Sequence, residues 1–224
     1  MRTRGSIKLF LVWRETYFTL HSLLFTLCLN LSSSFAFHWV RMPPVAEPEL
    51  LPVAQARAGG AEAWRILFRR YQLPLYAYVH ELVRHDQTSL DLVQETFIRA
   101  VRHLGTLRDD AKFGSWLFGI AHQQCIQHWR RSRTEQPLDG ESADLLDELD
   151  DGPAELLVRA EQAAQFRALL AQLPPPQRAV ITLFFLEEFS IEEIAGITGA
   201  PPGTVKSRLL HAKRTLKKLL EHQP

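Results

Sequence analysis

Cations and small polar side chains recur along one face of the C-terminal segment 203–220. Apolar residues alternate with them at spacings of four and three, which predicts an amphipathic helix. The polar residues are Thr204, Lys206, Ser207, Arg208, His211 and Arg214, and the apolar ones are Val205, Leu209, Ala212, Leu216 and Leu219. Lysine and arginine bind phosphates by charge, and side chains of these polar types also hydrogen-bond to base edges. The pattern therefore indicates contact with duplex DNA.

Aromatic, amide and basic side chains gather in a second segment, 112–133. Aromatic faces stack on unpaired bases, at about 1–3 kcal/mol each, while basic groups hold phosphates. Such a surface suits separated DNA strands better than an intact duplex. Its candidate contacts are Lys112, Trp116, His122, Gln123, Gln127, Arg130 and Arg131. Because Trp116 lies at helical spacing from Ile120, we expect it to be at least half buried, and the base contacts to come mainly from His122, Gln123 and Gln127.

Capping residues and helix breakers place the first group on the second of two short helices. Ser190 and Glu193 form a capping box, which predicts a helix from Ile191. The run Gly-Ala-Pro-Pro-Gly at 199–203 ends that helix, because proline cannot continue it and glycine tolerates positive φ. Two such helices, the second basic and polar, have the layout of a helix-turn-helix motif. An ordinary amphipathic hairpin with a solvated basic face has the same periodicity and stays open at this point.

A third polar face lies on a helix predicted to begin at a capping box of Thr88 and Asp91. Its expected apolar stripe is Leu92, Val93, Phe97, Ala100, Val101 and Leu104, and its polar residues are Asp91, Gln94, Glu95 and Arg102. A preceding helix is expected to open the core with Leu67, Phe68, Tyr71, Leu75, Tyr76 and Val79. Since no strand-like alternation or glycine-rich phosphate loop occurs, the fold class is predicted to be all-α.

These segments resemble the extracytoplasmic-function (ECF) sigma factors of bacterial RNA polymerase, of the sigma-70 family. Leu173–Val180, Ser190–Ala195 and Gly203–Leu209 are similar to their region four. Asp91–Ala100 is similar to their region two, as are the Trp-Leu-Phe, Ile-Ala and Arg-Arg elements of Trp116–Arg131. The resemblance implies two small helical domains and a sigma factor that directs promoter-specific transcription initiation. Its implied partners are core RNA polymerase, promoter DNA and an anti-sigma factor, with no cofactor or small-molecule substrate, in the cytoplasm.

The resemblance also assigns a role to each polar face. Asp91, Gln94, Glu95 and Phe97 would dock on the polymerase largest subunit, although a solvent-exposed helix face explains Asp91, Gln94 or Glu95 singly nearly as well. The face on 112–133 would melt and hold the minus-ten promoter element. The face on 203–220 would bind the minus-thirty-five duplex.

The sequence departs from the family at four positions on the minus-ten segment. Family members commonly carry arginine at Gly119, Arg-Asn at His122-Gln123, and aspartate at Gln127. The helix therefore has fewer fixed charges on its DNA side, which puts its minus-ten preference in doubt. Glycine at position 119 also weakens a helix by roughly 1 kcal/mol relative to alanine.

Charge is unevenly distributed along a chain whose net charge is only +1. The stretch 134–158 contains no lysine or arginine, and its acidic residues are Glu135, Asp139, Glu141, Asp144, Asp147, Glu148, Asp150, Asp151 and Glu155. We therefore expect a disordered tail at 42–60, region two at 61–133, an acidic flexible linker at 134–160 and region four at 161–224. The linker either threads the polymerase channel, as the resemblance implies, or is a solvated tether.

The first 41 residues do not fit this plan. Residues 16–40 contain no aspartate, glutamate, lysine or arginine over a length that could span a bilayer, with Arg2, Arg4, Lys8 and Arg14 before them. An anchor or export signal there would put the DNA-binding domains on the wrong side of a membrane. We expect translation to begin at Met42, with 1–41 belonging to an over-extended reading frame. A membrane-tethered signalling protein is the alternative if 16–40 is genuine.

Other classes are less well supported by the sequence. No nucleophile, base and carboxylate group recurs as a catalytic set, so no enzyme is predicted. His122, Cys125 and His128 suggest zinc, but positions three and six apart on one helix do not converge, and a fourth ligand is missing. A stand-alone helix-turn-helix regulator remains the rival, but it leaves Asp91–Phe97 and the aromatic segment unexplained.

Overall fold

The computed structural model describes residues 51–135, 165, 167–185 and 187–221 of the 224-residue chain. Within these ranges every regular element is a helix, which confirms the all-α class. The predictions for residues 1–41 and for nearly all of the acidic linker lie outside the described residues. None of the helices within the described ranges is long and apolar enough to cross a bilayer.

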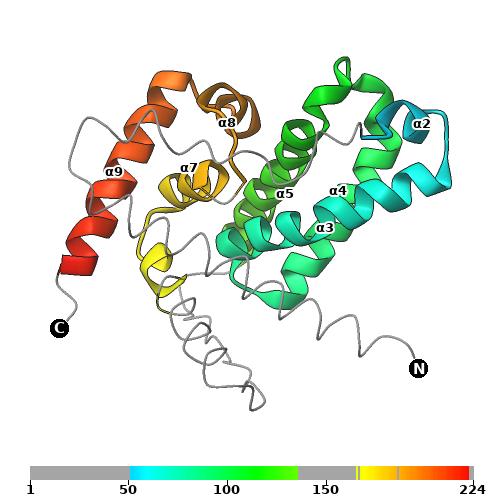
Figure 1. Cartoon of the computed structure of the whole chain (residues 1–224). Helices are drawn as coiled ribbons and strands as arrows, with labels where there is room; N and C mark the ends of the chain where they lie inside the picture. The colour runs from blue at the N-terminus through cyan, green and yellow to red at the C-terminus, as the bar shows by residue number, and fades with distance from the viewer. Residues whose placement is uncertain (1–50, 136–164, 166, 186, 222–224) are drawn as a thin grey trace, which may run out of the picture.

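The N-terminal bundle is built from three long helices and shorter pieces (Figure 1). Its elements are α2 (Val53–Arg57), α3 (Ala61–Val83), α4 (Asp86–His103), the 3-10 turns η1 (Leu104–Thr106) and η2 (Asp110–Lys112), and α5 (Phe113–Glu135). Helices α3, α4 and α5 pack against one another in all three pairs. Leu67, Leu75, Tyr78, Val79, Phe113, Leu117 and Phe118 fill the space between them. The α5 helix therefore sits with one side in this core and another side directed away from α3 and α4.

The predicted disordered tail at 42–60 is wrong for its last part. Val53 and Ala56 of α2 are buried, and Trp64 Nε1 donates a hydrogen bond of 3.0 Å to the carbonyl oxygen of Ala56. Arg57 forms an ion pair with Asp110 and a hydrogen bond to the carbonyl oxygen of Leu107. Contacts with Trp64 on one side and with Leu107 and Asp110 on the other thus hold the short helix α2 against the bundle.

The α4 helix begins earlier than the capping box of Thr88 and Asp91 predicted. His85 is the N-cap residue, and its ring accepts a hydrogen bond from the Thr88 amide at 3.2 Å. Asp86 then receives a 2.9 Å hydrogen bond from the Tyr76 hydroxyl and lies 3.0 Å from His80 Nε2. These contacts to α3 fix where α4 starts, which local sequence could not show.

Two residues assigned to apolar stripes are exposed instead. Phe68 is 44% exposed and Val101 is 56% exposed. Each lies at the margin of its stripe, where neighbouring helices leave it uncovered. The remaining predicted stripe residues of α4 are buried or packed against the core.

The C-terminal bundle contains a short helical stretch at 167–171, then α7 (Pro175–Phe185), α8 (Ile191–Thr198) and α9 (Pro202–Glu221). The predicted capping box is confirmed: Ser190 Oγ accepts from the Glu193 amide, and the Glu193 carboxylate accepts from the Ser190 amide. Gly199 ends α8 with a φ of +67°, a conformation that glycine adopts without steric cost. Val205, Leu209, Ala212 and Leu216 of α9 are buried as predicted.

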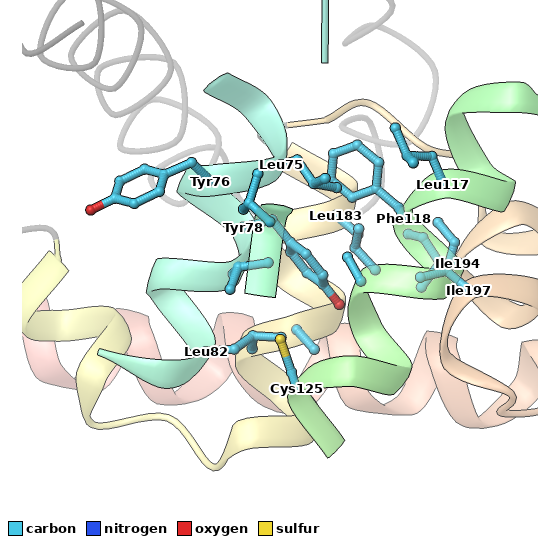
Figure 2. Packing of buried hydrophobic residues seen from close by; sticks show 14 of the residues in the cluster. Leu75, Tyr76, Tyr78, Leu82, Leu117, Phe118, Cys125, Leu183, Ile194 and Ile197 are labelled. Atoms are coloured by element: carbon cyan, nitrogen blue, oxygen red, sulfur yellow. The ribbon is translucent and has the colours of Figure 1, made fainter. Parts of the chain in front are cut away.

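The two bundles share one continuous core. Helix α8 packs along α5, and α7 packs between α3 and α9 (Figure 1). Leu183, Ile194 and Ile197 of the C-terminal bundle lie beside Leu75, Tyr78, Leu117 and Phe118 of the N-terminal bundle (Figure 2). Each bundle alone would leave part of this apolar surface in water.

Replacing Ser190 by alanine should lower the free energy of unfolding by about 1 kcal/mol, because the first turn of α8 loses its side-chain cap. Urea unfolding followed by circular dichroism measures this change. Ser207→Ala is the matched control, since that exposed hydroxyl only donates back to the Thr204 carbonyl oxygen within α9. Equal unfolding free energies for the two variants would contradict the importance of the cap.

Candidate nucleic-acid interface

The α9 helix presents the predicted duplex-binding residues opposite its buried stripe. Lys206, Ser207, His211 and Arg214 are exposed, whereas Thr204 and Arg208 are half-buried. All six lie on one helix that follows a tight turn after α8, as a helix-turn-helix requires. The structure thus brings the whole predicted group together on one helix.

Two features fix the rotation of α9 about its axis. Its apolar stripe packs on α7 and α8. Lys213 also lies over two aromatic rings of α7, with its Nζ atom 5.1 Å from the Phe185 centroid and 6.0 Å from that of Phe184. A cation over a ring face is attracted by the ring quadrupole. These two contacts prevent α9 from rotating about its axis, so its polar face stays directed away from α7 and α8.

The second group, on α5 and η2, is divided between surface and core. Lys112, Gln123, Arg130 and Arg131 are exposed, and Gln127 is half-buried. Trp116 is partly buried against the core, with its ring centroid 5.9 Å from that of Phe113. It therefore packs as expected, with limited area left for a base.

His122 does not lie where a base-contacting residue should. Only 8% of it is exposed, and its Nδ1 atom shares a 2.7 Å hydrogen bond with the buried Tyr78 hydroxyl. Burial lowers the pKa of His122 to about 4, and the nearby Arg208 cation adds to this shift. The imidazole is therefore neutral at physiological pH and already paired, so the structure corrects its assignment as a minus-ten contact.

A groove of about 440 Å³ lies between α5 and the C-terminal end of α8. Its walls are His122, Gln123, Ile126, Gln127 and Arg130 on one side and Gly196, Ile197, Thr198 and Gly199 on the other. The residues of α8 could not be recognised as part of this surface, because nothing in their apolar and glycine-rich sequence indicates a partner on another bundle.

The residues predicted to dock on polymerase, on α4, are partly exposed and partly buried. Asp91 and Gln94 are exposed, while the Glu95 carboxylate pairs with Arg99 at 2.8 Å. Phe97 is only 7% exposed and packs against the Phe68 ring at 4.8 Å between centroids. Its assignment as a docking contact is corrected, because its side chain belongs to the core.

The docking face predicted from the sequence did not include the exposed apolar residues of α4. Leu90, Ile98 and Val101 are all large and exposed. Together with Gln94 they are spaced by four, four and three residues, so they form one continuous line on the helix. The spacing was visible in the sequence, but only the structure shows which lines of α4 the core covers.

The His122, Cys125 and His128 group shows no arrangement for a metal. Cys125 is fully buried, and burial raises the pKa of its thiol to about 12. Within the described ranges, no group of three or more histidine, cysteine or acidic residues could hold an ion.

His122→Asn should reduce the loss of stability at acid pH. The folded pKa of about 4 lies below the unfolded value near 6.5, so between these pH values the unfolded chain binds the proton and the folded chain does not. Folding stability therefore falls as pH drops through this window, by up to roughly 3 kcal/mol for this one group. The advantage of the parent over His122→Asn in urea unfolding should shrink by that order between pH 7 and pH 4. A constant advantage, or the same trend in the exposed-site control His211→Asn, would contradict this.

Comparison with known proteins agrees with this layout. The family described as "Sigma-70 region 2" matches residues 67–135, and "Sigma-70, region 4" matches residues 163–216. The RNA polymerase sigma-H factor of Pseudomonas aeruginosa is 30% identical over 177 residues, which cover 75% of this chain and 92% of that protein. The ECF RNA polymerase sigma factor BldN of Streptomyces coelicolor is 33% identical over 171 residues, which cover 75% of this chain and 64% of BldN.

A solved structure has a similar fold. The sigma factor RpoE from Bartonella quintana, in complex with the anti-sigma factor NepR, superposes with a TM-score of 0.53 at 24% identity, over 71% of this chain and 99% of RpoE. The two matching regions, in this order, and the identity to ECF sigma factors over most of their length show the family. The chain belongs to the ECF RNA polymerase sigma factors of the sigma-70 family.

Proposed function

We propose that this sigma factor acts in the cytoplasm as a non-catalytic initiation subunit that binds core polymerase through α4 and promoter DNA through α5 and α9. The exposed polar face of α9, held opposite a buried stripe, carries this proposal. It combines cations, hydroxyls and an imidazole on a helix of the length that a major groove accepts.

At the minus-thirty-five element, α9 would enter the major groove with its N-terminal half. Lys206 and Arg214 are exposed cations and Arg208 is a half-buried one, and all three are suited to phosphates. Ser207 and His211 are suited to base edges. The first amides of α9 have no partner within the helix and can bind a phosphate.

At the minus-ten element, the exposed residues of α5 and η2 would hold separated strands. Gln123 and Gln127 have amides that can hydrogen-bond to base edges, and Arg130, Arg131 and Lys112 have the charge for phosphates. His122 is left out of this proposal, because its position and its bond to Tyr78 support a structural role.

Docking on core polymerase would combine polar and apolar contacts on α4. Asp91 and Gln94 lie among the exposed side chains Leu90, Ile98 and Val101. Protein interfaces commonly place an apolar centre within a polar rim, and this mixture fits that description. An anti-sigma factor is a further proposed partner, because the RpoE relative was solved in complex with one.

Run-off transcription with purified core polymerase and genomic fragments tests the function directly. Promoter-specific transcripts that require the protein are the expected result. Duplex binding without polymerase association or transcripts would instead indicate a regulator that acts alone.

Replacing Arg208 and Arg214 by alanine should weaken minus-thirty-five duplex binding and flatten its salt dependence. Each lost phosphate contact lowers the slope of log K against log salt by about 0.9, so the double variant should lose roughly two units. Fluorescence anisotropy across a salt series measures this. Lys217→Ala is the control, because that lysine lies near the far end of α9 and pairs with Glu221. An unchanged slope would remove both arginines from phosphate contact.

Val101→Asp combined with Ile98→Asp should weaken binding to core polymerase by tenfold or more, equivalent to about 1.4 kcal/mol. The same double variant should bind the minus-thirty-five duplex as the parent does. Ile66→Asp, an equivalent change to an exposed apolar residue on α3, is the control. Equal polymerase affinity for all three proteins would exclude the apolar line of α4 from docking.

A further inference from the structure

One large apolar side chain lies on the face of α9 that is proposed to bind duplex DNA. Leu210 is 48% exposed. Among the described residues, the other large apolar side chains that are exposed lie on α3 and α4, at Ile66, Phe68, Leu90, Ile98 and Val101. A single exposed leucine is ordinary on a protein surface. The place of Leu210 among the polar residues of α9 is what makes it informative.

Leu210 lies near the middle of the outer face of α9. The buried stripe of this helix is Val205, Leu209, Ala212 and Leu216. With 3.6 residues per turn, the line opposite that stripe passes through positions 203, 207, 210 and 214. Ser207 and Arg214 on this line are both exposed. Residues three and four apart are neighbours on a helix surface, so Leu210 lies between a residue suited to base edges and a cation suited to phosphates.

The packing of α9 gives Leu210 no place in the core. Helix α9 packs on α7 and α8 and lies at the edge of the molecule, with its buried stripe on the inner side (Figure 1). Among the described residues, Leu210 belongs neither to the buried cluster nor to the partly buried side chains packed against it. Lys213, over the Phe184 and Phe185 rings, fixes the rotation of the helix. Leu210 therefore keeps its outward position and does not exchange with the buried stripe.

An apolar side chain at this position has few favourable partners in duplex DNA. Leucine cannot form hydrogen bonds with phosphates or with the donors and acceptors on base edges. Covering those polar groups without replacing their hydrogen bonds costs free energy. The C5 methyl group of thymine is the apolar group that base edges present in the major groove. Leu210 would therefore gain free energy beside a thymine and lose it beside the other bases.

The position of Leu210 along α9 is compatible with a base contact. It lies in the N-terminal half of the helix Pro202–Glu221, which is the half that enters the groove in the proposed function. Three residues of an α-helix rise about 4.5 Å, and successive base pairs of B-DNA are about 3.4 Å apart. Side chains at positions 207 and 210 therefore reach neighbouring base pairs.

We propose that Leu210 is a specificity-determining residue that contacts the methyl group of a thymine in the minus-thirty-five element. The polar residues around it supply the hydrogen bonds and the phosphate contacts. Because the contact involves no charge, its removal should change base preference and leave the salt dependence of binding unaltered. This inference rests on the proposed function, since it states how α9 distinguishes one base pair of its element.

Base analogues that differ only by this methyl group test the proposal. The holoenzyme is assembled from core polymerase and the full chain, and the probe is a promoter fragment identified by run-off transcription. Each thymine of the minus-thirty-five element is replaced in turn by deoxyuridine, which keeps the base pair and lacks the methyl group. Fluorescence anisotropy measures the affinity. At one position the parent should bind about fourfold more weakly, the factor that corresponds to burying one CH₂-sized group.

Leu210→Ala should abolish this difference. The variant should bind the thymine and deoxyuridine probes equally, with the affinity of the parent for the deoxyuridine probe. Alanine favours a helix, so α9 should stay intact, and the salt slope should equal that of the parent. Ile66→Ala is the control, because it truncates an exposed apolar residue on α3. This control should keep the sensitivity of the parent to the methyl group.

Cytosine at the same position provides an independent check. The base 5-methylcytosine has its methyl group at the ring position of the thymine methyl, and it differs from cytosine in nothing else. The parent should bind the 5-methylcytosine probe more tightly than the cytosine probe, again by about fourfold. Leu210→Ala should bind these two probes equally.

Several results would overturn the proposal. One is a parent holoenzyme that is insensitive to every methyl group of the element, and another is an element without thymine on either strand. Sensitivity that persists in Leu210→Ala would assign the methyl contact to a different residue. Equally weakened binding of Leu210→Ala to all probes, with a deoxyuridine effect of the parent's size, would place Leu210 against a protein surface. If the parent supports no promoter-specific transcription with core polymerase, the proposed function fails, and this inference fails with it.

Discussion

The packing of α8 onto α5 at Gly119 is the contact on which the rest of the structure depends. It joins two bundles into one core, because Ile197 and Ile194 complete the apolar surface around Tyr78 and Phe118. It also determines which polar residues of α5 can be reached from solvent. Gln123 and Arg130 remain exposed, while His122 is enclosed. One missing side chain therefore influences stability and the accessible DNA-binding surface together.

Buried polar groups restrict how the two bundles can pack against each other. The Tyr78–His122 hydrogen bond joins α3 to α5 within the N-terminal bundle. Between the bundles, the buried Arg178 guanidinium of α7 donates to the carbonyl oxygen of Glu81 on α3. A buried polar group without a partner costs free energy, so a shifted register that broke this bond would be penalised. The Glu187 carboxyl group avoids the free-energy cost of a buried charge in a different way. Burial raises its pKa to about 8, so the group is mostly protonated at neutral pH.

Much of this fold could be predicted from local sequence, and the misses share a physical cause. The Ser190 and Glu193 cap, the Gly199 break and the buried stripe of α9 all depend on residues within one or two turns, and the structure confirms them. The start of α4 was misplaced because Asp86 is held by Tyr76 and His80 of another helix. The α2 helix was missed because tertiary contacts stabilise it. Trp64 of α3 donates a hydrogen bond to it, and its Arg57 pairs with Asp110, more than fifty residues further along the chain.

The residues of the candidate site also divide into those that local sequence could predict and those that depend on distant parts of the chain. The six polar residues of α9 could be grouped from periodicity, since a single helix carries them. His122 and Phe97 were misassigned because residue type cannot show which neighbours cover a helix face. Gly119 stood out in the sequence only as a departure from the family, and nothing linked it to Ile197; only their approach in space makes them a pair.

The shared core also has a consequence for synthesis. The N-terminal bundle leaves the ribosome before Leu183, Ile194 and Ile197 exist to cover Tyr78 and Phe118. At roughly 5–20 residues per second, the residues between 136 and 221 take on the order of ten seconds to appear. During that interval the nascent bundle carries an uncovered apolar strip, and transiently exposed apolar surface of this kind favours aggregation and creates the need for chaperones.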